Sequence, residues 1–186
     1  MLKAFKYRLY PTAAQTVLLN KHIGCCRFVY NFFLEKKQAA WSDNETNINR
    51  FGLQKQLPDI KKEFEWLKEI NAQSLQSAIK NLDTAFKRFF FFLSKHPSFK
   101  KKSNGGSFSV PQDVRFKNGK LVIPKFTEGI KIVLHRPIKG EIKQATISRT
   151  PTGKFFASIL CEIGEAVKPK APIVADTTIG IDLGIK

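Results

Sequence analysis

Acidic residues are scarce in this sequence. Its 186 residues include 15 Asp or Glu against 32 Lys or Arg, which gives a formal net charge of +17 and an isoelectric point of about 10.0. Such a surface repels itself unless it is solvated or meets a polyanion, so composition favours nucleic acid as the partner. A membrane surface is the rival partner, but no basic amphipathic helix stands apart from the apolar pattern.

Long apolar runs and paired cysteines are also missing. No apolar run reaches the roughly 18 residues that a membrane span needs. The first residues, MLKAFKYRLYP, lack the apolar centre of a signal peptide, so we expect a cytoplasmic protein. The cysteines are Cys25, Cys26 and Cys161, and without a C-x-x-C pair they fit neither a disulfide framework nor a zinc site within this chain.

Apolar residues at steps of three and four predict a core helix that starts near Asn71 and closes near Pro97. Polar residues, including Gln73 and Gln76, open this helix. Its apolar face consists of Leu75, Ile79, Leu82, Phe86, Phe89, Phe90 and Leu93.

The first 41 residues predict a strand followed by two helices. Residues 2–9 alternate, which places Lys6 and Arg8 on one face of a strand. A helix is expected to begin after Thr12 as N-cap. Gly24 is expected to end it, and a second helix runs from about residue 25 to 41. This order fits a helix-turn-helix, but the second helix is very aromatic, which favours a helical hairpin packed in a bundle.

Helical periodicity continues to residue 96 and then changes. A short helix is expected over residues 50–57 and a further segment from Pro58, so a helical bundle follows a single strand. Beyond Gly106 the pattern alternates in five strands, with turns at Asn118-Gly119 and at residues 151–153. The sequence therefore predicts an α+β fold with a small antiparallel β-barrel. Residues 164–178 are typical of a linker.

Basic residues concentrate between the bundle and the strands. From Thr84 to Gln112 there are six Lys or Arg and no acidic residue. This one-sided charge is more typical of a nucleic-acid interface than of an ordinary solvated surface.

The last residues, TIGIDLGIK, form an apolar strand pattern with one carboxylate, Asp182. An Asp on the first strand of a ribonuclease-H-like fold holds Mg²⁺. The same string also opens actin-like sugar kinases and chaperone ATPases, where it contacts ATP, so the motif is ambiguous by itself.

Taken together, the motifs give the chain a family resemblance. They are FKYRLYPTAAQ, GCCRFVYNFFL, SLQSAIKNLDTAFKRFFFF, PSFKKK, KLVIPK, LHRPIKGEIK, SRTPTGKFFASILCE and GIDLGIK, in this order. The chain resembles the amino-terminal half of the TnpB (OrfB) family of transposon-encoded RNA-guided endonucleases. An ATPase would have its phosphate loop at the start, which disfavours that alternative.

This resemblance implies a division into domains. A wedge β-barrel would comprise residues 1–12 and 107–170, and a helical recognition lobe would comprise residues 13–106. A RuvC-like nuclease domain would begin at 177–186. The implied partners are a guide RNA and a target DNA with its transposon-adjacent motif, whereas the oligomeric state stays open.

The resemblance and the basic pattern also imply site residues. Asp182 would be a catalytic residue and a ligand of Mg²⁺, while the other carboxylates and the zinc site of the family are absent, so we expect no cleavage by the chain as given. Phosphate and base contacts are expected from Lys3, Lys6, Arg8, Gln73, Gln76, Lys87, Arg88, Lys100, Lys101, Lys102, His135 and Arg136.

Two other functions stay open at this point. The chain could be a nuclease-dead regulator that binds RNA or DNA. It could also be a helix-turn-helix transposon protein that binds DNA without RNA.

Overall fold

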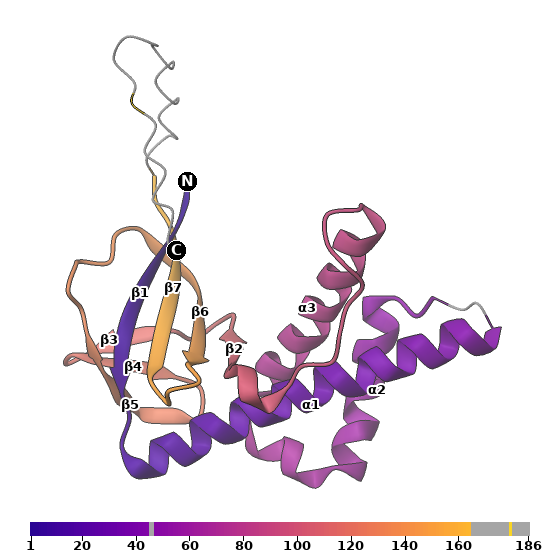
Figure 1. Ribbon diagram of the computed structural model, residues 1–186. Coiled ribbons are helices and arrows are strands. Elements are labelled where there is room, and N and C mark those ends of the chain that lie inside the picture. The colour runs from indigo at the N-terminus through magenta and orange to yellow at the C-terminus, as the bar shows by residue number, and fades with distance from the viewer. Residues whose placement is uncertain (45–46, 165–178, 180–186) are drawn as a thin grey trace.

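The computed structural model describes residues 1–44, 47–164 and 179. One seven-stranded antiparallel sheet lies beside a group of helices, and the long helix α1 joins them (Figure 1). The elements in chain order are β1 (Leu2–Tyr10), α1 (Ala13–Asn44), α2 (Arg50–Glu63), η1 (Glu65–Glu69), α3 (Ala72–Phe90), η2 (Lys102–Asn104), β2 (Gly106–Val110), β3 (Arg115–Lys117), β4 (Lys120–Ile123), β5 (Phe126–Val133), β6 (Glu141–Arg149) and β7 (Phe155–Glu162).

The N-terminal strand β1 is central in the sheet, whose strand order is β2-β6-β7-β1-β5-β4-β3. The expected alternation is confirmed, because Phe5, Tyr7 and Leu9 are buried while Lys6 is exposed. Since β1 pairs with both β5 and β7, the first ten residues hold together strands that come more than a hundred residues later.

The expected barrel is wrong, because the sheet is open. Its edge strands in the described part of the chain are β2 and β3, which do not pair with each other. Both α1 and α3 contact β2, so the helices pack at the edge where barrel closure would need another strand.

The first of the five expected strands after Gly106 is divided in two. Pro111 cannot donate a backbone hydrogen bond, and Asp113 has φ of +58°, so the chain leaves the sheet between β2 and β3. The expected turn at Asn118-Gly119 is confirmed. Both residues have positive φ, 49° and 69°, as a two-residue hairpin loop requires.

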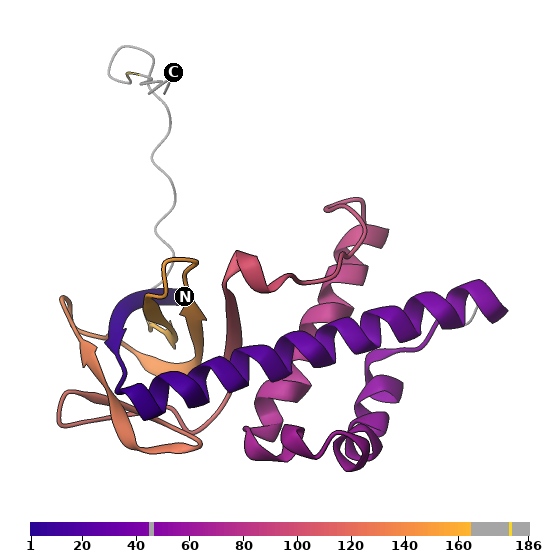
Figure 2. The same ribbon diagram turned by 60° about the horizontal axis from the view of Figure 1, so that its bottom comes forward.

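Helix α1 is continuous for 32 residues, so the predicted turn at Gly24 is wrong and with it both the helix-turn-helix and the hairpin. Figure 2 shows the helix running unbroken from below the sheet to the far end of the helical part. Its start is as expected: the Gln15 N–H donates to Thr12 Oγ1 (3.3 Å) and the Thr12 N–H donates to Gln15 Oε1 (3.1 Å), a reciprocal capping box. A helix can carry a single glycine at a cost of about 1 kcal/mol when packing on both sides holds it.

Gly24 provides a test of this continuity. A Cβ added there would meet nothing within 4 Å, so Gly24→Ala is expected to raise the free energy of unfolding by about 1 kcal/mol through helix propensity alone. Gly24→Pro is expected to lower it by about 3 kcal/mol. Urea denaturation followed by circular dichroism measures both changes. A destabilising Gly24→Ala would indicate a turn at this position.

The other helices differ from expectation at their ends. Pro58 lies inside α2 and does not begin a new segment. Helix α3 ends at Phe90, and Phe90 and Leu93 are exposed, so these two residues do not belong to the core. Four of the remaining residues of the predicted apolar face, Leu75, Ile79, Leu82 and Phe86, are buried as expected, whereas Phe89 is half-buried. None of the helices in the described ranges combines the length and apolarity that crossing a membrane requires.

Helices and sheet meet tightly where the chain enters β2. A Cβ at Gly106 would collide with Ile23 of α1, and a Cβ at Gly105, which has φ of +74°, would collide with the carbonyl oxygen of Arg149 in β6. Glycine therefore allows the chain to pass between α1 and β6 at this point. This close approach brings the start of α3 beside β2 and shapes the surfaces described next.

Candidate nucleic-acid interface

A polar cleft lies between the first turns of α3 and the strands β2 and β6. We call it the amide cleft, because five glutamines and an asparagine line it. It encloses about 330 Å³ and is lined by Gln54, Gln73, Gln76, Ser77, Lys80, Asn81, Ser109, Pro111, Gln112 and Gln144. Side-chain amides offer a donor and an acceptor side by side, which matches the edge of a base.

Partly buried hydrogen bonds fix the start of α3, which forms one wall of the cleft. Asn71 caps the helix with its side-chain oxygen, which accepts from the N–H of Gln73 (3.2 Å). The Asn71 N–H donates in turn to His22 Nε2 (3.3 Å), and His22 Nδ1 contacts the Leu18 carbonyl oxygen (2.9 Å). Burial lowers the pKa of His22 and so favours the neutral ring that this arrangement needs. Helix α1 thereby holds the start of α3 in place.

Gln73 and Gln76, both expected to contact nucleic acid, differ in their freedom to do so. The Gln73 side chain donates from Nε2 to Gln112 Oε1 (2.8 Å), so it is engaged within the protein. Gln76 is exposed on the same helix, lines the cleft and makes no side-chain hydrogen bond within the described residues. Gln76 is therefore the glutamine of α3 best placed to meet a base edge, and Gln73 shapes the cleft.

The segment from residue 96 to 104 connects α3 to β2, and we call it the lysine strap because it holds Lys100, Lys101 and Lys102. Asn31 of α1 fixes its course: Asn31 Oδ1 accepts from the Lys100 N–H (2.8 Å) and Asn31 Nδ2 donates to the Lys100 carbonyl (3.1 Å). The Lys100 ammonium lies 4.0 Å from the centre of the Tyr30 ring, and burial lowers its pKa.

Lys101 and Lys102 are exposed. Within the described residues none of the three strap lysines has an acidic partner within 4.0 Å. Their charge is therefore available to an external anion, and phosphate is the anion that a row of lysines suits.

Lys6 and Arg8 lie together on the outer face of the sheet. The Lys6 ammonium is 4.8 Å and the Arg8 guanidinium 5.0 Å from the ring centre of Phe156 on the neighbouring strand β7. Arg8 also lies 5.4 Å from the ring of Tyr10, and its Nη1 is buried without a hydrogen-bond partner in the described residues. This face combines cations and aromatic rings, but it belongs to a different surface from the amide cleft.

Lys3, His135 and Arg136 gather around the buried aromatic residues of β1. The Lys3 ammonium and the Arg136 guanidinium lie 5.7 Å and 5.3 Å from the Phe5 ring centre. The Tyr7 hydroxyl donates to the Arg136 carbonyl (3.1 Å), and the His135 ring is 5.3 Å from that of Tyr7.

Lys87 and Arg88 are exposed on the last turn of α3, where Lys87 pairs with Asp83 (3.0 Å). The twelve predicted contact residues therefore form five groups. Two of them, the pair Gln73 and Gln76 and the strap lysines, lie where the helices meet the sheet. Sequence reasoning missed Gln54 of α2, Gln112 of the loop after β2 and Gln144 of β6, which carry no pattern of their own.

Asp182, the predicted catalytic residue and metal ligand, lies outside the described residues. Apart from residue 179, the predicted linker from residue 165 onward and the predicted start of a nuclease domain at 177–186 also lie outside the described residues. Within the described ranges no group of three or more His, Cys, Asp or Glu side chains could hold a metal ion.

Known proteins match this chain over almost its whole length. Residues 1–46 match a family model described as a helix-turn-helix domain, HTH_OrfB_IS605. A "Putative RNA-guided DNA endonuclease" from Streptomyces pristinaespiralis is 35% identical over 189 residues, which cover 98% of this chain and 46% of that protein. The "Putative RNA-guided DNA endonuclease InsQ" of Escherichia coli (strain K12) is 30% identical over 99% of this chain and 46% of its own length.

The chain belongs to the TnpB (OrfB) family. It spans about half the length of these two relatives and matches their N-terminal half. The "Virulence protein VsdF" of Salmonella dublin is also similar, with 34% identity over 55% of this chain and 95% of that protein. In this TnpB-family chain the described part of the region matched by the helix-turn-helix model, residues 1–44, consists of one strand and one uninterrupted helix.

Proposed function

We propose that residues 1–164 are the nucleic-acid-binding part of a transposon-associated RNA-guided DNA endonuclease, and that they bind a guide RNA and its target DNA. The observation that carries this proposal is the position of the acid-free lysine strap, which leads from the end of α3 to β2, one wall of the amide cleft. Lysines bind phosphates without regard to sequence, whereas amides read base edges. The combination suits a protein that holds a backbone and inspects a short motif.

The printed names of the relatives support guide RNA and DNA as partners. The continuous helix α1 speaks against the alternative, a helix-turn-helix protein that binds DNA without RNA, because that motif needs a turn between its two helices.

Sequencing the RNA that co-purifies with the chain tests the choice between these functions. The proposal expects a structured RNA enriched well above cellular background. An RNA-free chain that selects one duplex sequence with full affinity would support the DNA-binding alternative instead.

Gln76 gives a sharper test of base reading. Replacing Gln76 with Ala is expected to remove roughly 1–3 kcal/mol of discrimination at one base pair of the preferred duplex, because a bidentate amide contact to adenine is lost. Affinity for unrelated duplexes should change little. A randomised duplex library, followed by titration of the preferred site and its single-base variants, measures the effect.

Lys80→Ala is the matched control, since Lys80 lines the same cleft on the same helix. It should weaken binding to all duplexes alike, because an ammonium contacts phosphate. If the Gln76 and Lys80 variants lost affinity in the same uniform way, the assignment of base reading to the start of α3 would be wrong.

A further inference from the structure

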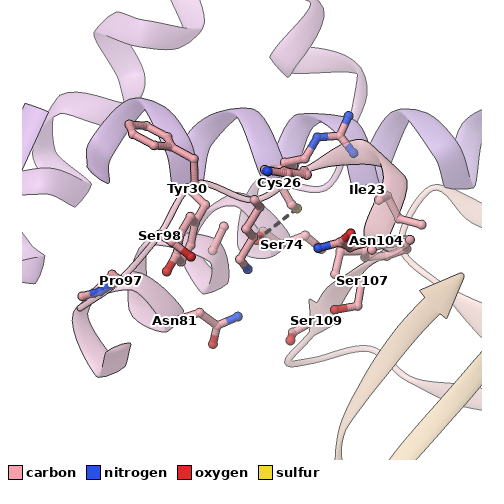
Figure 3. A pocket seen from close by; sticks show the side chains of 18 of the residues that line it. Ile23, Cys26, Tyr30, Ser74, Asn81, Pro97, Ser98, Asn104, Ser107 and Ser109 are labelled. Atoms are coloured by element: carbon pink, nitrogen blue, oxygen red, sulfur yellow. Dashed lines mark hydrogen bonds between the residues drawn. The ribbon is translucent and has the colours of Figure 1, made fainter. Parts of the chain in front are cut away.

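A second cavity lies between α1, α3, the lysine strap and β2, on the other side of α3 from most of the amide cleft. It encloses about 480 Å³, within the range of about 300–1,000 Å³ that is typical of small-molecule sites. Figure 3 shows Ser74, Asn81 and Ser109 around this hollow, with Tyr30 and Ser98 at its far end. The described lining contains no Asp or Glu.

The floor of this cavity carries a polar group that has no hydrogen-bond partner among the described residues. Ser74 is 1% exposed, and its hydroxyl oxygen is buried without a hydrogen-bond partner in the described residues. Such a group costs free energy unless a ligand or neighbour satisfies it. The neighbouring Cys26 does not satisfy the Ser74 hydroxyl, because its thiol donates to the Ser74 carbonyl oxygen instead (3.5 Å). Burial raises the pKa of this thiol to about 12, so it stays protonated.

The walls of the cavity combine further hydrogen-bonding side chains with apolar ones. The side chains of Asn81, Ser107 and Ser109 line the cavity and make no hydrogen bond within the described residues. Ala78 and Phe108 contribute apolar surface beside them. A flat heterocycle with several donors and acceptors fits this mixture better than an aliphatic ligand does.

The rim is positively charged. Arg27 of α1 and Lys100 and Lys101 of the strap line the cavity, and none of them has an acidic partner within 4.0 Å among the described residues. The Lys100 ammonium lies over Tyr30, so Arg27 and Lys101 are the freer cations. A phosphate at the rim would therefore place its attached sugar and base toward Ser74.

We propose that this cavity binds one unpaired nucleotide, with its base against Ser74 and Asn81 and its phosphate at Arg27 and Lys101. The inference rests on the proposed function and deepens it, because a nucleotide turned out of an RNA or DNA strand that follows the lysine strap could enter here. Ribonucleotides and deoxyribonucleotides share the required chemistry, and the experiment separates these two sources.

Calorimetric titration of the RNA-free chain with each ribonucleoside and deoxyribonucleoside 5′-monophosphate tests the site, with inorganic phosphate as the comparison. At least one nucleotide is expected to bind ten times more tightly than phosphate. Tighter binding of the ribose series would indicate that the nucleotide comes from RNA, and tighter binding of the deoxyribose series that it comes from DNA. Equal affinity for phosphate and all nucleotides would overturn the proposal and leave an anion patch.

Ser74→Ala is the decisive variant, because removing a hydroxyl that has no partner should leave the free energy of unfolding unchanged or higher. Nucleotide affinity is expected to fall about fivefold in Ser74→Ala and about tenfold or more in Arg27→Ala. Lys117→Ala, which removes one positive charge from an exposed position on β3 outside this cavity, should bind nucleotides as the parent does.

The experiment distinguishes a failure of the nucleotide site from a failure of the proposed function. Unchanged nucleotide affinity in Ser74→Ala, or no nucleotide binding by a chain that still binds RNA, would overturn this site alone. A chain that binds neither nucleotides nor RNA would overturn the proposed function as well.

Discussion

Replacing Lys101 and Lys102 with Glu is expected to lower the affinity for RNA and for duplex DNA by about 100-fold. Both side chains are exposed, and neither has an acidic partner within 4.0 Å in the described part of the chain. A hydrogen bond to a charged group contributes about 1.5 kcal/mol or more, so two lost phosphate contacts account for about 3 kcal/mol. The slope of the logarithm of affinity against the logarithm of salt concentration should become shallower by about two, because two phosphate contacts are lost.

Lys100 is best left unchanged in this variant. Its ammonium packs on Tyr30, and its backbone is held by Asn31, so a carboxylate at this position would disturb the fold as well as the charge. Keeping Lys100 ensures that a loss of affinity reports on the surface of the strap.

The matched control reverses the charge of Lys117 and Lys120, which are exposed at the far edge of the sheet on β3 and β4. Both double variants change the net charge of the chain equally. The control should lose only a few-fold in affinity through the weaker overall field. Equal losses in a filter-binding titration of the two variants would show that the net charge, and not the strap, governs binding.

Local patterns in the sequence predicted most of the strands and helices but not where they end. The alternation of Phe5, Tyr7 and Leu9 and the spacing of the apolar residues in α3 were sufficient, because burial of one face produces a regular period. Gly24 was misleading. Glycine is a weak local signal, and packing of α1 against both the sheet and α3 makes a straight helix more stable than a turn.

The closure of the sheet could not be predicted from strand patterns. A barrel and an open sheet place the same residues inside, and the difference lies in what covers the last edge. Here α1 and α3 contact β2, and the glycines at 105 and 106 permit the close approach. Such a contact between distant elements leaves no period in the sequence.

The candidate site could be predicted only in part, because some of its features are local in sequence and others are not. A run of lysines without acidic residues is a visible signal, and Lys101 and Lys102 are indeed exposed and unpaired within the described residues. The amide cleft depends on glutamines from α2, α3, the loop after β2, and β6, which only folding brings together. The Ser74 hydroxyl, which has no hydrogen-bond partner among the described residues, is likewise visible only in three dimensions.

The central claim is that this surface binds a polyanion, and the salt dependence of RNA binding tests it most directly. Each neutralised phosphate releases condensed counterions, so contact with about six phosphates should lower the affinity on the order of 10³-fold between 50 and 200 mM salt. The net charge of +17 and the strap lysines, which have no acidic partner within 4.0 Å among the described residues, support contacts of this number.

A filter-binding titration of the purified chain with a structured RNA, repeated across this range of salt, supplies the measurement. The account predicts a straight line of steep negative slope when the logarithm of the affinity is plotted against that of the salt concentration. A flat line, or an affinity too weak to measure at 50 mM salt, would contradict it.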